Sequence, residues 1–188
     1  MAVLPIRIMG DPVLHSPASP VTTVDDDIRR LVDDMFDTMD AAPGVGLAAP
    51  QVGVDARVFV YSYEDDEGAP WRGVVINPVL WISPLEPGAP DPDAESEGCL
   101  SFPGERYPLR RADRALLLGE DLEGRAVRIE VDGWRARILQ HEFDHLDGVL
   151  YVDRLGDSDG KSAQKIARKR GWGRPGNSWM PGIDDLDA

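Results

Sequence analysis

The chain has 188 residues, 42% of them hydrophobic, which is enough for one domain with a substantial core. Its formal net charge of −14 argues against DNA or a membrane surface as a partner, and no stretch approaches the ~20 apolar residues of a membrane span. The single cysteine, Cys99, excludes an internal disulfide, and the opening residues lack the pattern of a signal peptide. We therefore expect a protein of the reducing cytoplasm.

The first predicted helix covers residues 25–41. Apolar side chains recur there at spacings of three and four, and the aspartates at its start favour a helix N-terminus. Proline and glycine in residues 43–53 then end the helix. Four β-rich runs follow, separated by turn residues as in antiparallel hairpins. These predicted strands are residues 56–63, 73–82, 114–121 and 125–131.

The remaining segments complete the expected architecture. Residues 83–98, proline-rich and acidic, are predicted to form a loop, and residues 133–147 the second helix. The order of helix, strands and helix predicts the α+β class, with antiparallel sheets packed around the central helix that carries the sequence HEFDH. We expect a single domain over residues 1–157, followed over residues 158–188 by a basic helix and a tail rich in Trp, Gly and Pro.

Two of the three histidines, His141 and His145, lie four residues apart around Glu142 in the pattern HExxH. On a helix both histidines share one face, so their imidazoles can bind the same divalent transition metal. Glu142 is turned from them by about 100° and can reach a water molecule without being a ligand. Two ligands and a base suit metal-assisted hydrolysis. The alternative, a solvated helix face, is disfavoured because apolar residues surround the pattern.

A catalytic metal site needs a third protein ligand. Zinc proteases with this pattern take a downstream Glu or His, but neither residue follows His145 in this chain. The downstream Asp153 would be an unusual substitute. Upstream, Cys99 in the sequence EGCLS is a candidate, and the competing interpretation is a buried apolar thiol.

Three segments in this order resemble the three signature motifs of the peptide deformylases: GVGLAAPQ (44–51), EGCLS (97–101) and QHEFDHLDG (140–148). The similarity extends over roughly residues 3–155. It implies a metal-dependent hydrolase that removes the formyl group from the N-terminal formyl-methionine of nascent peptides and releases formate. It also implies that ferrous iron is the usual metal in the cell, with zinc, nickel or cobalt able to occupy the site.

The resemblance assigns roles to residues of all three motifs. Glu142 is the implied general base and then acid. The side-chain amide of Gln51 and the backbone N–H of Leu100 are the implied oxyanion hole. The implied metal ligands are Cys99, His141 and His145. The residues implied to lie along the extended substrate are Val45, Gly46, Gly98, Glu97 and Arg106.

Some of these roles have ordinary alternatives. Glu97 and Arg106 could instead be surface charges of an acidic stretch. A methionine side chain needs an apolar pocket, for which Val45, Trp134 and Ile138 are candidates, although core packing is the usual role of such residues.

The C-terminal part reverses the sign of the chain, because residues 161–176 carry six basic residues and no acidic one. Since the family acts on nascent chains, this segment is a candidate for contact with ribosomal RNA, and a solvated cap helix is the alternative. We expect a monomer.

Two other functions are alternatives to deformylation, a zincin-like metalloprotease and a non-catalytic binding module on the same fold. The first predicts a downstream ligand, and the second predicts loss of Glu142, of Gln51 or of a ligand.

Overall fold

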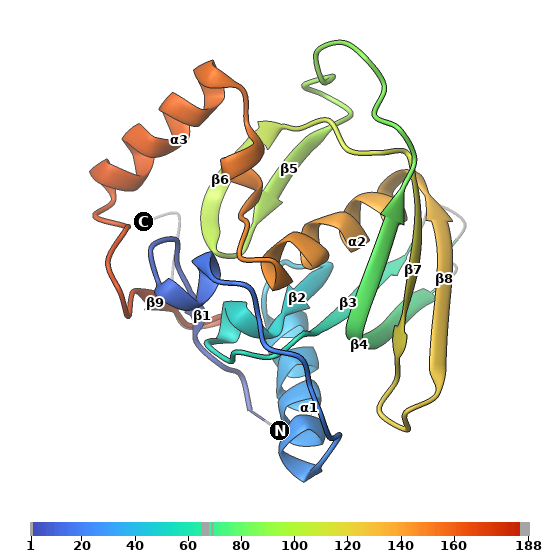
Figure 1. Cartoon of the computed structure of the whole chain (residues 1–188). Coiled ribbons are helices and arrows are strands. Elements are labelled where there is room, and N and C mark those ends of the chain that lie inside the picture. The colour runs from blue at the N-terminus through green and yellow to red at the C-terminus, as the bar shows by residue number, and fades with distance from the viewer. Residues whose placement is uncertain (1, 65–67, 69, 185–188) are drawn as a thin grey trace.

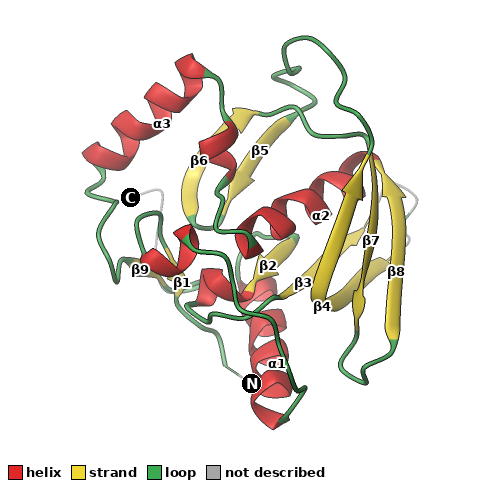
Figure 2. Ribbon diagram, viewed as in Figure 1, coloured by secondary structure: helices red, strands yellow, loops and turns green. Residues whose placement is uncertain are grey.

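The computed structural model describes residues 2–64, 68 and 70–184. Within these ranges the chain forms three α-helices and nine strands (Figure 1, Figure 2). The helices are α1 (Asp26–Ala41), α2 (Gly133–Leu146) and α3 (Asp157–Lys169). The strands are β1 (Ile6–Arg7), β2 (Gly46–Ala48), β3 (Val58–Glu64), β4 (Pro70–Ile82), β5 (Ser96–Cys99), β6 (Phe102–Pro108), β7 (Arg114–Glu120), β8 (Ala126–Asp132) and β9 (Ser178–Trp179).

The strands form three antiparallel sheets. The largest has the order β2-β3-β4-β7-β8, and the two smaller sheets are the pairs β5-β6 and β1-β9. Helix α2 lies between the large sheet and the β5-β6 pair (Figure 1). The predicted α+β architecture, with antiparallel sheets around the helix that carries HEFDH, is therefore confirmed.

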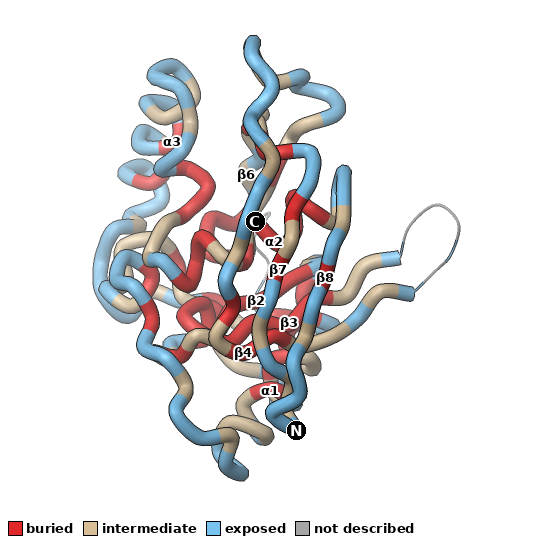
Figure 3. The backbone as a smooth tube through the Cα atoms, turned by 45° about the vertical axis from the view of Figure 1, so that its right-hand side comes forward, coloured by how far each residue is buried: buried red, intermediate tan, exposed pale blue. Residues whose placement is uncertain are grey.

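Helix α2 is buried over most of its length, and Figure 3 shows the buried residues concentrated along α2 and the strands beside it. It contacts β2, β3, β7 and β8. Leu139 is fully buried and belongs to the same hydrophobic cluster as Phe59 and Leu117. Each fully buried side chain of this kind contributes about 1.5–3 kcal/mol relative to exposure. The sheet thereby fixes the position of the helix that presents the histidines.

Helix α1 covers the other side of β2 and β3. Its apolar stripe of Val32, Met35 and Met39 is buried, as the spacing predicts. The side chain of Asp25 accepts hydrogen bonds from the backbone N–H groups of Asp27 and Ile28 at 3.1 and 3.0 Å, so it caps the helix N-terminus. The helix begins at the residue after this cap.

The predicted loop over residues 83–98 is wrong at its end. Its last three residues belong to β5, in which Glu97 pairs with Tyr107 of β6. Strands β2 and β6 have no counterpart among the predicted strands. Strand β2 has three residues, and β6 contains one glycine and two prolines, so neither shows the alternation by which strands are recognised.

The tail after α3 returns to the start of the chain. Strand β9 pairs with β1, with Trp179 opposite Ile6, and the N–H of Gly173 donates to Met9 O at 2.9 Å. Residues 173–179 of the tail therefore pack against residues 6–9, whereas the proposed division of the chain at residue 157 stays a prediction. Among the described residues, no helix has both the length and the apolar character needed to cross a membrane.

Candidate active site

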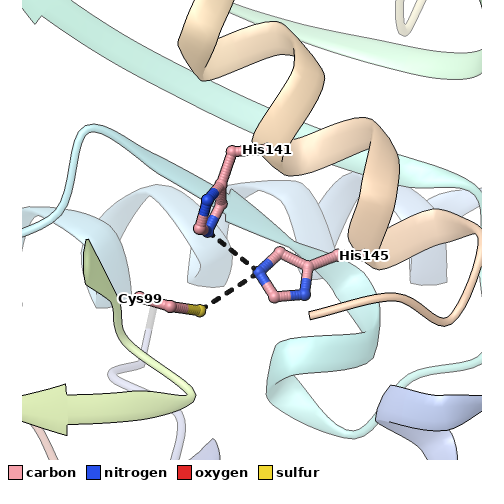
Figure 4. A group of neighbouring side chains, drawn as sticks. All are labelled: Cys99, His141 and His145. Atoms are coloured by element: carbon pink, nitrogen blue, oxygen red, sulfur yellow. Dashed lines mark hydrogen bonds between the residues drawn. The ribbon is translucent and has the colours of Figure 1, made fainter. Parts of the chain in front are cut away.

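Three segments that are distant in the sequence meet at one end of the cavity beside α2. Helix α2 contributes His141, Glu142 and His145, and the end of β5 contributes Cys99. The segment from β2 into the following 3-10 helix, Ala49–Val52, contributes Gln51. Figure 4 shows Cys99 and the two histidines pointing toward one another from α2 and β5.

The donor atoms of Cys99, His141 and His145 converge. His145 Nε2 lies 3.3 Å from Cys99 Sγ and 3.2 Å from His141 Nε2, and all three donor atoms lie within 4.8 Å of one another (Figure 4). A tetrahedral metal with bonds of about 2.0–2.3 Å holds its ligand atoms about 3.3–3.6 Å apart. The two measured separations are close to that spacing. One thiol and two imidazoles also form a donor set that suits zinc, iron, cobalt or nickel.

The orientation of the His141 ring is fixed by a contact at Nδ1, the nitrogen that faces away from the donor cluster. Its Nδ1 lies 2.6 Å from Glu97 Oε1, which leaves Nε2 directed at the cluster. Burial opposes ionisation of Glu97, but the hydrogen bonds and charges of His141 and Arg111 outweigh it and hold the pKa of Glu97 well below its usual range. For His145, burial and the charge of a protonated His141 hold the pKa well below the usual range.

Glu97 belongs to a buried ionic network that continues under α2. Arg111 donates to Glu97 through Nε and Nη2 at 3.1 and 2.7 Å, and to Asp144 Oδ2 through Nη1 at 2.6 Å. Arg137 donates to Glu97 at 3.0 Å, and Arg154 makes two 2.6 Å bonds to Asp144. A buried charge of this kind is stable only while it has partners. No pattern in the sequence indicates these roles of Arg111 and Asp144, because only the fold brings their partners together.

Glu142 is 3% exposed and lies directly against Gly46. A Cβ atom at residue 46 would come within 2.2 Å of Glu142 Oε1, so the absence of a side chain there makes room for the carboxylate. Glu142 Oε2 is buried and has no hydrogen-bond partner within the described ranges. Burial raises the pKa of Glu142 to about 7, which is close to the value that suits a group exchanging protons at neutral pH.

Gln51 is buried and directs its amide nitrogen at the cysteine turn, residues 99–101. Its Oε1 accepts the backbone N–H of Ala48 at 2.8 Å, which orients the side chain. Its Nε2 then lies 3.4 Å from Ser101 Oγ and 3.8 Å from Cys99 Sγ. An N–H donor is therefore available beside the cluster, next to the backbone of Leu100.

A cavity of about 530 Å³ opens in front of these groups. It brings together most of the residues that the sequence singles out, including Cys99, His141, Glu142, Gln51 and Leu100. The predicted substrate and pocket residues that line it are Val45, Gly46, Glu97, Gly98, Arg106, Trp134 and Ile138. Trp179 of the tail also lines it, and no sequence pattern indicated that. Asp153, the unusual downstream ligand candidate, instead accepts the N–H of Leu150 at 2.9 Å and lies outside the three-residue donor group.

Comparison with known proteins places relatives of one family over most of the chain. A family described as Polypeptide deformylase matches residues 3–161. The peptide deformylase of Mycolicibacterium paratuberculosis is 54% identical over 97% of this chain and 96% of its own length. The crystal structure of peptide deformylase from Thermus thermophilus has a TM-score of 0.76 and 40% identity, and covers 89% of this chain and 94% of that one. The peptide deformylase of Ehrlichia chaffeensis in complex with actinonin has a TM-score of 0.76 and 36% identity, over 90% and 98% of the two chains.

The fold and these similarities define a metal-dependent hydrolase. The chain belongs to the peptide deformylase family, as the resemblance of its three motifs predicts. Its activity is the removal of the formyl group from the N-terminal formyl-methionine of nascent peptides. The protease and binding-module alternatives are thereby set aside.

Proposed function

We propose that Cys99, His141 and His145 hold one divalent metal ion and that the deformylation takes place in the cavity beside them. The observation that carries this proposal is the convergence of their three donor atoms next to the buried carboxylate of Glu142. When bound, the ion supplies Lewis acidity, which makes water nucleophilic at neutral pH. We propose ferrous iron in the cell, with zinc, nickel or cobalt able to replace it in a purified sample.

In this proposal Glu142 moves the proton. Its carboxylate takes a proton from the water that adds to the formyl carbon, and then gives that proton to the nitrogen of the methionine as the carbon–nitrogen bond breaks. The products are formate and a peptide with a free amine. The pKa of about 7, raised by burial, and the contact with Gly46 support this role because they describe a carboxylate that is held in place and exchanges protons readily.

Two N–H donors would stabilise the negative charge that develops on the formyl oxygen. The side-chain Nε2 of Gln51 and the backbone N–H of Leu100 are the proposed pair. Gln51 is supported in this role by the hydrogen bond from Ala48, which leaves only its amide nitrogen facing the cysteine turn. Removal of one such donor typically costs about 100- to 1,000-fold in kcat.

The substrate would lie extended along the cavity. Strand β2 is an edge strand of the large sheet, since β3 is its only partner among the described strands, so its backbone can accept a peptide as an added strand. Val45, Gly46 and Gly98 would contact that peptide, with Val45, Trp134 and Ile138 around the methionine side chain. Arg106 would lie near the entrance, where its Nη2 donates to Ser96 O at 2.7 Å.

Glu97 is better described as a positioning residue than as a substrate contact. Its two carboxylate oxygens already bind His141, Arg111 and Arg137 at 2.6–3.1 Å, and the residue is buried. We propose that it holds the imidazole of His141 in the orientation that places Nε2 among the donor atoms.

The oligomeric state, the compartment and the partners of the enzyme are proposed from its substrate, the nascent peptide. We propose that it acts as a monomer in the cytoplasm, with residues 1–157 as the catalytic domain. Helix α3 and the residues after it carry the basic segment 161–176, which is a candidate for contact with ribosomal RNA near emerging nascent chains.

The residue assignments are tested by formate release from formyl-Met-Ala-Ser, with protein purified anaerobically and loaded with iron or nickel. Glu142→Gln keeps the shape of the side chain but cannot carry the proton, so we expect kcat to fall by at least about 100-fold at equal metal content. Glu123→Gln, on an exposed turn, is the matched control and should keep parental activity. A Glu142→Gln enzyme as active as this control would contradict the proposed role.

A further inference from the structure

The C-terminal tail places a tryptophan against the cysteine turn. Trp179 in β9 pairs with Ile6 of β1 and is only 6% exposed. It belongs to the hydrophobic cluster that contains Leu47 of β2, and it also lines the cavity beside Leu100. The residue lies outside the matched range 3–161, and the proposed function gives it no role.

The indole of Trp179 makes one directed polar contact. Its Nε1–H donates to the backbone oxygen of Leu100 at 2.8 Å. The N–H of the same peptide unit, that of Ser101, points the other way and donates to Cys99 Sγ at 3.4 Å. Because a trans peptide is planar, the bond at the oxygen fixes the direction of the N–H. Trp179 therefore orients the Ser101 N–H, which donates a hydrogen bond to the sulfur of Cys99.

The tail holds the other side of this turn as well. The backbone N–H of Met9 donates to Ser101 O at 2.9 Å, and Met9 O accepts the N–H of Gly173 at 2.9 Å. The Leu100 carbonyl is thus held by Trp179 of the tail, and the Ser101 carbonyl by Met9, which the tail contacts in turn. A second tail tryptophan, Trp172, packs on Phe102 with ring centroids 4.9 Å apart.

We propose that Trp179 is a positioning residue of the active site, which holds the Ser101 N–H against the Cys99 thiolate and so tunes the metal that this sulfur would bind. The proposal rests on the proposed role of Cys99 as a ligand. A hydrogen bond from an N–H group draws electron density from a thiolate. Hydrogen bonds of this kind change the electronic properties of a metal site. The tail would then influence the chemistry through the Leu100–Ser101 peptide group, in addition to stabilising the fold.

The test compares Trp179→Phe with Trp172→Phe in the cobalt-substituted protein. The first variant keeps an aromatic ring in the buried position but removes the N–H, and the second removes an indole from the same tail but keeps the hydrogen bond from Trp179 to Leu100 O. The readouts are the thiolate-to-cobalt charge-transfer absorption, kcat and KM for formyl-Met-Ala-Ser, and the melting temperature. Benzothienylalanine at position 179 keeps the bicyclic shape without the N–H, and it replaces Phe if that variant does not fold.

Without the indole N–H, the thiolate becomes a stronger donor, so the charge-transfer band should move to longer wavelength. We expect kcat to fall about 3- to 10-fold, as for the loss of one hydrogen bond, with KM nearly unchanged. Trp172→Phe should leave the band in place. A Trp179→Phe protein with an unshifted band and parental kcat would overturn the proposal and leave Trp179 a core residue. If the parent protein itself lacked the band, Cys99 would not be a ligand, and both proposals would fail.

Discussion

Helix α2 and the Cys99 turn supply the two halves of the donor group, and they are built in different ways. On α2 the helical repeat places His141 and His145 on one face, so the pair is visible in the sequence. The Cys99 turn depends on contacts from distant segments, including Met9, Gln51 and Trp179. One half of the site is thus set by local geometry and the other by the fold, and perturbing each half should have distinct consequences.

Removing the metal should have the largest effect, because both halves of the donor group act through that ion. We expect dialysis against a chelator of transition metals to reduce formate release to background, because three converging donors without their ion leave only the oriented side chains. Addition of nickel should restore the activity, which formate release per chain measures. Chelated protein that retains full activity would contradict a metal-dependent mechanism.

The close contact between Gly46 and Glu142 gives the next largest effect. Gly46→Ala puts a Cβ where Glu142 Oε1 now lies, so the carboxylate must move, and we expect kcat to fall about 100-fold. Gly156→Ala is the matched control, since its Cβ would meet nothing within 4 Å. Equal steady-state rates for the two variants would show that the position of Glu142 is not critical.

The buried ionic network beside α2 should have its main measurable effect on stability. Arg111→Met leaves Glu97 and Asp144 with fewer partners in a buried site, and we expect the free energy of unfolding to fall by about 2 kcal/mol. Arg128→Met removes an exposed ion pair with Glu130 and should cost less than about 1 kcal/mol. Urea denaturation of the two variants measures the difference. Equal losses would mean that burial adds nothing to the pairing of Arg111.

The smallest effect concerns a helix that does not supply a donor atom. Asp25→Ala removes the cap of α1 and should lower the free energy of unfolding by about 1 kcal/mol, with kcat unchanged. Urea denaturation and the formate assay test the two parts separately. A fall in kcat at saturating metal would show that α1 is coupled to the site more directly than its packing indicates.

The same contrast explains what the sequence could predict. Both long helices and four strands follow from periodicity, because each buries an apolar stripe or face of its own. The family resemblance places Glu97 along the substrate, whereas its bonds to His141, Arg111 and Arg137 depend on how β5 lies against α2.

The tail shows the limit of local patterns most clearly. Its tryptophans and glycines indicate that it folds back, but nothing in residues 171–180 specifies Leu100 as the partner of Trp179. That pairing exists because β9 pairs with β1, which lies near the other end of the chain. Each of the two strands has only two residues. Contacts between such short strands carry no signal in a single sequence.

We propose above all that the Cys99 turn and α2 together hold one metal ion, while Glu142 does not bind it. The most direct measurement is the metal content per chain of the parent protein, Cys99→Ser, His145→Ala and Glu142→Gln after anaerobic loading and desalting. We predict one ion per chain in the parent and in Glu142→Gln, and loss of the ion from the other two. Stoichiometric metal in folded Cys99→Ser, bound as tightly as in the parent, would contradict the claim.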